Sequence, residues 1–140
     1  MPAVALALPR TALAQSASAE SFEAAVAAII AGRTPIDDGI AIDMPPLSEN
    51  GNAVDLAIKV ASPTTLEDHV TAIHILAEKN PYPRVATFSL TPRAGRAEVA
   101  TRIRLATTQT ILVLAETNQG RIHRAGKEVI VILGACLEGG

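Results

Sequence analysis

The sequence predicts an all-β protein, an antiparallel β-sandwich with one helix at its N-terminal end. From Val54 onward, short stretches in which apolar residues alternate with polar ones are separated by Gly, Pro, Asn and Asp. This pattern is typical of the strands and turns of sandwiches. The intervals between the stretches are too short for the crossover helices that parallel strands need. With 140 residues, the chain has the length of one domain that can bury a core without disulfides.

The segment from Ser21 to Gly32 is the one clear helix. Ser21 is placed to cap its N-terminus, Glu23 suits the positive end of the helix dipole, and Gly32 is placed to end it. Apolar residues recur at three- to four-residue spacing and form one stripe, which should pack on the body of the protein. These residues are Phe22, Val26, Ile29 and Ile30.

Residues 34–52 are interpreted as a loop rich in turn residues, interrupted by a short edge strand at Ile40 and Ile42. The segment 110–115 is apolar on both faces, so it should form a central strand. The full set of later strands is expected at residues 54–60, 70–77, 86–90, 99–105, 110–115 and 127–133, with a short separate strand around Ile122.

The sequence of residues 1–19 predicts the remnant of a signal peptide or, alternatively, a disordered leader. A short apolar run from Pro2 to Leu8 is followed by Ala12-Leu13-Ala14, which fits the small-x-small pattern of a cleavage site. On the first interpretation, the mature protein is extracytoplasmic.

Several function classes are disfavoured by composition. The net charge is −2, aromatic residues make up 2% of the chain, and Lys and Arg form no basic patch, so we expect no nucleic-acid partner. No apolar run reaches the length of a membrane span. The three histidines, His69, His74 and His123, show no ligand spacing, and we expect neither a metal nor another cofactor. Arg102 and Arg104 are interpreted as a solvated strand face more readily than as an anion site.

The single cysteine, Cys136, follows the apolar run 129–133 in a tail of small residues. Glycines and chain ends order poorly, so Cys136 should lie on a mobile arm just outside the last strand. Free cysteines are more often small buried hydrophobes, but little apolar surface is available here to bury this one. A thiol enzyme would need a base held close to the sulfur. The pattern favours a covalent attachment point, since the thiolate is the reactive form.

Three blocks of residues, together with the tail, resemble a known family. The blocks are Ala77-Glu78-Lys79-Asn80-Pro81-Tyr82-Pro83, Ala86-Thr87-Phe88 and Ala100-Thr101-Arg102-Ile103-Arg104-Leu105-Ala106. With the helix and the terminal Gly134-Ala135-Cys136, they make residues 21–140 similar to the SoxY family, the sulfur-carrier subunits of the bacterial thiosulfate-oxidising Sox system.

The resemblance implies an immunoglobulin-like sandwich, a periplasmic location and a heterodimer with a SoxZ-like subunit. It also implies transient partners: SoxXA attaches thiosulfate oxidatively to the cysteine, SoxB hydrolyses off sulfate, and in some organisms SoxCD oxidises the remaining sulfane sulfur. The protein itself would be a covalent substrate carrier and not an enzyme. The alternative is an immunoglobulin-like interaction subunit whose cysteine is a disulfide tether.

The resemblance divides the chain into the leader 1–19, an immunoglobulin-like sandwich with its helix over 20–133, and a flexible carrier arm over 134–140. Cys136 is then the attachment site, and the arm residues are Gly134, Ala135, Leu137, Glu138, Gly139 and Gly140. The tail departs from the family's GGCGG pattern because Ala135 replaces a glycine and Leu137-Glu138 precede the last glycines. We expect steric fit to matter more than the charge of Glu138.

Overall fold

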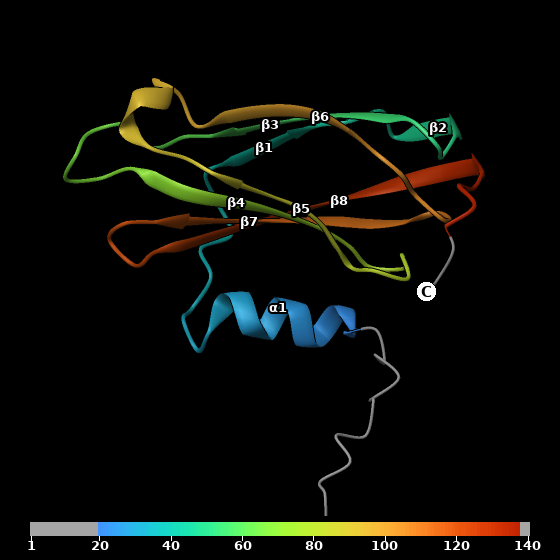
Figure 1. Ribbon diagram of the computed structural model, residues 1–140, viewed down its shortest axis with the longest axis horizontal. Helices are drawn as coiled ribbons and strands as arrows, with labels where there is room; N and C mark the ends of the chain where they lie inside the picture. Colours follow the sequence, from blue (N-terminus) through green and yellow to red (C-terminus); the bar gives the residue numbers. More distant parts are fainter. Residues whose placement is uncertain (1–19, 138–140) are drawn as a thin grey trace, which may run out of the picture.

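The computed structural model describes residues 20–137 and shows two facing β-sheets with a helix below one of them (Figure 1). The elements are α1 (Phe22–Ile30), β1 (Ile40–Asp43), β2 (Leu47–Asn50), β3 (Val54–Val60), β4 (Val70–Ala77), β5 (Arg84–Ser89), the 3-10 turn η1 (Pro92–Ala94), β6 (Glu98–Ile103), β7 (Gln109–Thr117) and β8 (Ile122–Leu133). The leader expected at residues 1–19 lies outside the described part of the chain.

The sheets have the strand orders β1-β3-β6 and β2-β8-β7-β4-β5. Paired strands run antiparallel, except β2 and β8, which run parallel. The predicted all-β, immunoglobulin-like sandwich with an N-terminal helix is confirmed. The segment 110–115 lies in β7, between β8 and β4, so its prediction as a central strand is confirmed too.

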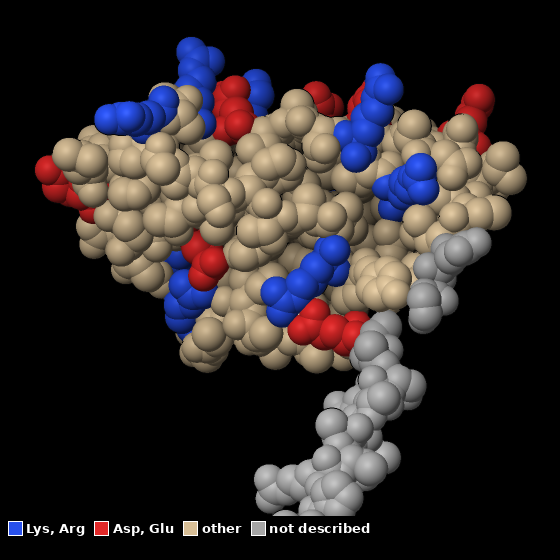
Figure 2. All heavy atoms as spheres, in the orientation of Figure 1, with Lys and Arg blue, Asp and Glu red and all other residues tan. Residues whose placement is uncertain are grey.

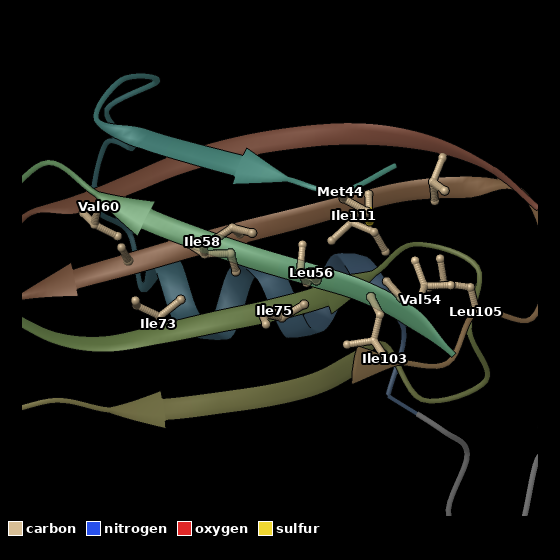
Figure 3. Close-up of a cluster of buried hydrophobic side chains, with 14 of the residues drawn as sticks. Met44, Val54, Leu56, Ile58, Val60, Ile73, Ile75, Ile103, Leu105 and Ile111 are labelled. Carbon is tan, nitrogen blue, oxygen red and sulfur yellow. The ribbon is translucent and has the colours of Figure 1, made fainter. Parts of the chain in front are cut away.

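The main core fills the space between the two sheets (Figure 3). In β3, residues alternate between the core and the solvent as their sequence pattern predicts. The sheets contribute fully buried aliphatic side chains that face one another, among them Leu56, Ile58, Ile73, Ile75, Ile111 and Val113. Successive residues of β7 point to opposite faces, so its other apolar residues, Leu112 and Leu114, face the helix.

Helix α1 packs on the outer face of the five-stranded sheet (Figure 1). Ala25 and Ile29 are buried against Leu76 and Leu114. The backbone N–H of Ala24 donates to Ser21 Oγ at 3.1 Å, so Ser21 is the N-cap, as predicted. The helix ends at Ile30 instead of continuing to Gly32, since Ala31 takes a left-handed φ of 51°.

The C-terminal end of α1 is tied to the sheet through Arg33. Its guanidinium donates to the carbonyl oxygens of Ile29 and Ile30 at 2.6 and 2.9 Å, and to Glu116 Oε1 at 2.5 Å. His74 Nε2 lies 2.8 Å from the other oxygen of Glu116. Burial alone would raise the pKa of Glu116, but the hydrogen bonds from Arg33 and His74 outweigh it and hold that pKa below its ordinary value.

Replacing Glu116 with Gln should lower the free energy of unfolding by about 1–2 kcal/mol at pH 7, because charge-assisted hydrogen bonds at a partly exposed site are lost. A carboxyl with a lowered folded-state pKa stabilises the fold above its unfolded-state pKa, near 4.3, and stops doing so as pH falls through the folded value. The difference from wild type should therefore shrink as the pH falls below the unfolded-state value. Urea unfolding of wild type and Glu116→Gln at pH 7 and at pH 3 measures this difference in the free energy of unfolding. Glu98→Gln, at an exposed position, is the control and should show no such dependence.

Two predictions for the chain path are wrong. Residues 47–50 were expected in a loop but form β2, since Leu47 pairs with Ile130 and Asn50 with Leu133. A four-residue segment between turn residues shows no usable periodicity, so its pairing with β8 decides its conformation. Residues 122–133 form one long strand instead of two, because β7 pairs with it continuously from Gln109 to Glu116.

Candidate functional site

The segment that carries Cys136 begins where β8 ends, and a chain of three backbone hydrogen bonds holds its base. The N–H of Gly51 donates to the carbonyl oxygen of Leu133 at 2.7 Å, that of Leu105 to Gly51 at 2.8 Å, and that of Ala135 to Leu105 at 2.9 Å. Gly51 comes from the β2–β3 turn and Leu105 from the β6–β7 connection. We call this arrangement the arm clamp, and it links both sheets to the start of the arm.

The arm clamp requires glycine at two positions because backbones approach closely there. A Cβ on Gly51 would overlap the carbonyl oxygen of Leu105 and come within 3.0 Å of the nitrogen of Ala135. A Cβ on Gly134 would overlap the carbonyl oxygen of Ala106. Neither glycine has a positive φ, so space and not backbone conformation is what excludes a side chain.

The structure corrects the expected start of the arm. Gly134 and Ala135 were expected to stand outside the packed body, but Gly134 lies against Ala106 and Ala135 is only 7% exposed. Within the described residues, Cys136 is therefore the exposed residue after Ala135, while Leu137 is half-buried and its N–H donates to the carbonyl oxygen of Ala135 at 3.1 Å. The mobility expected of the arm stays a prediction. Glu138, Gly139 and Gly140 lie outside the described residues.

Cys136 is exposed and has a free thiol. It lies at the edge of a groove with a volume of about 680 Å³. The groove is lined by Asn80, Tyr82, Arg84, Val85, Arg102, Arg104, Cys136 and Leu137. On the face shown in Figure 2, Lys and Arg side chains surround a hollow next to the C-terminal end of the described chain. We call this hollow the arginine groove.

The arginine groove brings together residues that are far apart in the sequence. Arg84 begins β5, Arg102 lies in β6 and Arg104 follows β6, while Cys136 comes after β8. The sequence pattern favoured a solvated strand face for Arg102 and Arg104. They are exposed as predicted, but they also line one groove with the thiol.

Two polar residues to which the sequence analysis gave no role, Asn80 in the groove lining and the buried Gln109 beside it, hold the neighbouring backbone by hydrogen bonds. The amide nitrogen of Asn80 donates to the carbonyl oxygen of Arg104 at 2.8 Å, and its oxygen accepts from the Ala106 N–H at 3.0 Å. Gln109, which is 3% exposed, donates to the same oxygen of Asn80 at 2.8 Å and accepts from the Lys79 N–H at 2.8 Å. The available signals were the block that contains Asn80 and a glutamine at the start of an apolar strand.

Two of the arginines are held by carboxylates outside the groove. Arg84 Nε lies 2.6 Å from Glu20 Oε1, and this hydrogen bond lowers the pKa of Glu20. Arg102 Nε lies 2.8 Å from Asp55 Oδ1. Neither carboxylate lines the groove. Within residues 20–137, the Arg104 side chain makes no ion pair or hydrogen bond.

The three histidines lie apart from this site and from one another. His69 Nδ1 is 2.9 Å from the carbonyl oxygen of Thr65, His123 Nδ1 is 2.8 Å from that of Asp38, and His74 contacts Glu116. Across the described residues, no group of three or more His, Cys, Asp and Glu is arranged to hold a metal ion. In the same part of the chain, no helix is long and apolar enough to cross a membrane.

Residues 26–136 match the family described as the sulfur oxidation protein SoxY. The chain belongs to the SoxY family. The match ends at Cys136 and includes every groove residue except Leu137. No curated protein sequence matches the chain.

Solved structures agree with this assignment. The sulfur carrier protein SoxY from Chlorobium limicola f. thiosulfatophilum is 34% identical with a TM-score of 0.62, over 76% of this chain and 88% of that one. A superoxide reductase variant from Ignicoccus hospitalis is 15% identical with a TM-score of 0.60, over 73% and 85%. A putative superoxide reductase from Thermotoga maritima is 19% identical with a TM-score of 0.58, over 68% and 86%. The latter two share only the fold with this SoxY chain.

Proposed function

We propose that this chain is a periplasmic sulfur carrier that holds thiosulfate-derived intermediates covalently on Cys136 and presents them to Sox enzymes. The observation that carries the proposal is the exposed Cys136 thiol, which projects from the arm clamp at the end of the SoxY-family match. The likeness to a SoxY named as a sulfur carrier supports it. The chain then acts as a substrate carrier and leaves catalysis to its partners.

The proposed chemistry uses the thiolate as the nucleophile. Loading joins the sulfur of Cys136 to the sulfane sulfur of thiosulfate, releases one proton and passes two electrons to a SoxXA-type cytochrome. Hydrolysis by a SoxB-type enzyme then adds water across the bond between the sulfane and sulfonate sulfurs. This step leaves a persulfide on the cysteine and releases hydrogen sulfate. Where a SoxCD-type enzyme is present, it oxidises the persulfide.

The arm clamp limits how far the sulfur can reach. Ala135 is anchored through its N–H, and Cys136 is the residue directly after this anchor. A residue spans at most about 3.5 Å, so the sulfur stays near the body while the clamp is closed. A partner enzyme must therefore dock close to the arginine groove or open the clamp.

Intact-mass spectrometry of protein purified from its native host tests the carrier function. We expect thiosulfonate or sulfane adducts on Cys136. The competing function, a disulfide tether, would instead show Cys136 joined to a second polypeptide and released by reductant. Finding only that linkage would overturn the carrier proposal.

A SoxZ-like subunit is the proposed stable partner, and an apolar patch offers a surface for it. Leu47, Ile130 and Ile132 are large apolar residues on the outer face of β2 and β8, exposed by 47%, 47% and 67%. Leu47 and Ile130 are direct partners in the sheet. Leu133, 64% exposed, follows them at the base of the arm. Exposed apolar residues gathered at a sheet edge are typical of an interaction surface.

Ile132→Glu should weaken the complex with a SoxZ-like subunit by at least tenfold in Kd, because a charge would enter an apolar contact. Leu66→Glu is the matched control, since Leu66 is 78% exposed and lies on neither β2 nor β8. Isothermal titration of the two variants and wild type measures the effect. Equal affinity of all three would place the interface elsewhere.

A periplasmic location follows from the signal-peptide interpretation of residues 1–19. Fusing the full chain to a reporter that is active only after export tests it. Activity should depend on residues 1–19, and an active fusion without them would contradict this interpretation.

A further inference from the structure

We propose that the arginine groove binds the sulfonate end of the adduct on Cys136, so that the loaded arm folds back onto its own domain. This inference rests on the proposed function for the identity of the adduct. The preference of the groove for an anion is nevertheless a property of the protein alone, and it can be measured without any Sox enzyme.

The charge of the groove lining supports an anionic occupant. Its eight lining residues, all within the described part of the chain, include Arg84, Arg102 and Arg104 and no carboxylate. Glu20 and Asp55 pair with Arg84 and Arg102 from outside the groove, so the positive charge left without an ion-pair partner there is mainly that of Arg104. The whole chain, by contrast, has a net charge of −2. A positive groove on an acidic protein attracts anions locally, since charges beyond a Debye length of about 8 Å are largely screened at physiological salt.

The three arginines have different roles. Arg84 and Arg102 pair with Glu20 and Asp55, so part of their charge is compensated and some of their donors are already in use. Arg104 makes no side-chain ion pair within the described residues, and its backbone is held by Asn80. Among residues 20–137, Arg104 is therefore the groove arginine whose guanidinium donors have no protein partner.

The chemistry of a thiosulfonate matches these donors. Its sulfonate end has three acceptor oxygens and one negative charge, and a guanidinium presents five N–H groups in a planar fork. Cys136 lines the groove itself, so a short adduct can enter it without unfolding the arm clamp. Removing sulfate leaves a persulfide with no sulfonate group. The groove then binds the loaded form and releases the hydrolysed one.

The first test compares two reagents of opposite charge that modify Cys136. The sulfonatoethyl and trimethylammonioethyl methanethiosulfonates both react when the thiolate attacks the sulfur and methanesulfinate leaves. In Arg104→Gln at low ionic strength, we expect the anionic reagent to react about threefold more slowly and the cationic one about threefold faster, the size expected for one nearby charge in water. The ratio of the anionic to the cationic rate should therefore fall about tenfold.

Two further variants make this result specific. Arg93→Gln removes the same charge from η1, at the opposite end of the sandwich from the C-terminus (Figure 1), and should leave the ratio unchanged. Arg104→Lys keeps the positive charge, so this variant should keep most of the wild-type preference for the anionic reagent. A ratio that is equal in wild type and Arg104→Gln, with both proteins folded by circular dichroism, would overturn the proposal.

The second test asks whether the bound adduct docks. In NMR spectra, the sulfonatoethyl adduct should shift the Arg104 side-chain Nε–H resonance and slow amide exchange at Leu137, and the trimethylammonioethyl adduct should do neither. Identical spectra for the two adducts would overturn docking. If docking is observed but Cys136 supports no thiosulfate turnover, the groove proposal holds and the carrier function fails. If Cys136 supports thiosulfate turnover but the adduct does not dock, the carrier function holds and the groove proposal fails.

Discussion

Cys136→Ser should abolish thiosulfate-dependent turnover in a reconstituted Sox system, reducing the rate by at least a thousandfold. Serine nearly keeps the size of the side chain but removes the soft, ionisable nucleophile on which covalent loading depends. Because the residue is exposed, the free energy of unfolding should change by less than about 0.5 kcal/mol. Cytochrome reduction by thiosulfate measures the rate, and thermal unfolding checks the fold.

Leu137→Ala is the matched control for this substitution. It alters the neighbouring side chain and leaves the thiol in place, so loading by SoxXA should persist. A Cys136→Ser protein that still supports turnover would remove the basis of the carrier function. Loss of turnover in both variants, with Cys136 of Leu137→Ala still reactive toward thiol reagents, would show that partner recognition depends on Leu137 as well.

Gly51→Ala should lower the free energy of unfolding by about 2–4 kcal/mol, above the usual range for a surface turn, because the added methyl group overpacks a rigid site. The Cβ would overlap the carbonyl oxygen of Leu105 and lie 3.0 Å from both the Ala135 nitrogen and Val131 Cγ1. Backbone atoms supply two of these contacts, so no side-chain rotation relieves them. The clamp must open instead.

Gly126→Ala provides the comparison. A Cβ there meets nothing closer than 3.6 Å, in ordinary contact with Thr110, and the position has no positive φ. Its effect on stability should lie within about 1 kcal/mol of zero. Urea unfolding gives the free energies, and amide exchange at Ala135 reports on the clamp. That amide should be protected in wild type and in Gly126→Ala, and should exchange fast in Gly51→Ala. Equal stability of the two variants would show that the clamp is not tightly packed.

Under the proposed function, the arm clamp and the arginine groove would together set how the cargo on Cys136 is presented. The clamp keeps Cys136 within reach of the groove, and the groove is charged to receive an anion. On our proposal, an enzyme that takes the adduct would compete with the arginine groove for it. The longer tail of this chain, with Leu137 lining the groove, adds apolar surface next to the sulfur.

The sequence by itself determined most strands of the core and the family to which the chain belongs. Alternation of apolar and polar side chains along β3 follows from the strand geometry, which places neighbours on opposite faces, so it is visible within a few residues. The blocks around Asn80 and Arg102 and the terminal Cys136 were enough to indicate the SoxY family, since the family match needs only the order of residues along the chain.

Only the tertiary structure decided which residues meet. Leu47–Asn50 became a strand because β8 pairs with it, and Ala135 became buried because Leu105 accepts its N–H. Arg84, Arg104 and Cys136 share one groove, although Arg104 lies about 20 residues after Arg84 and Cys136 about 30 residues after Arg104. Periodicity records which face a residue takes within its own strand. Sheet order and the paths of loops decide which residues of different strands come close together. Both depend on long-range strand pairing, which no local sequence pattern contains.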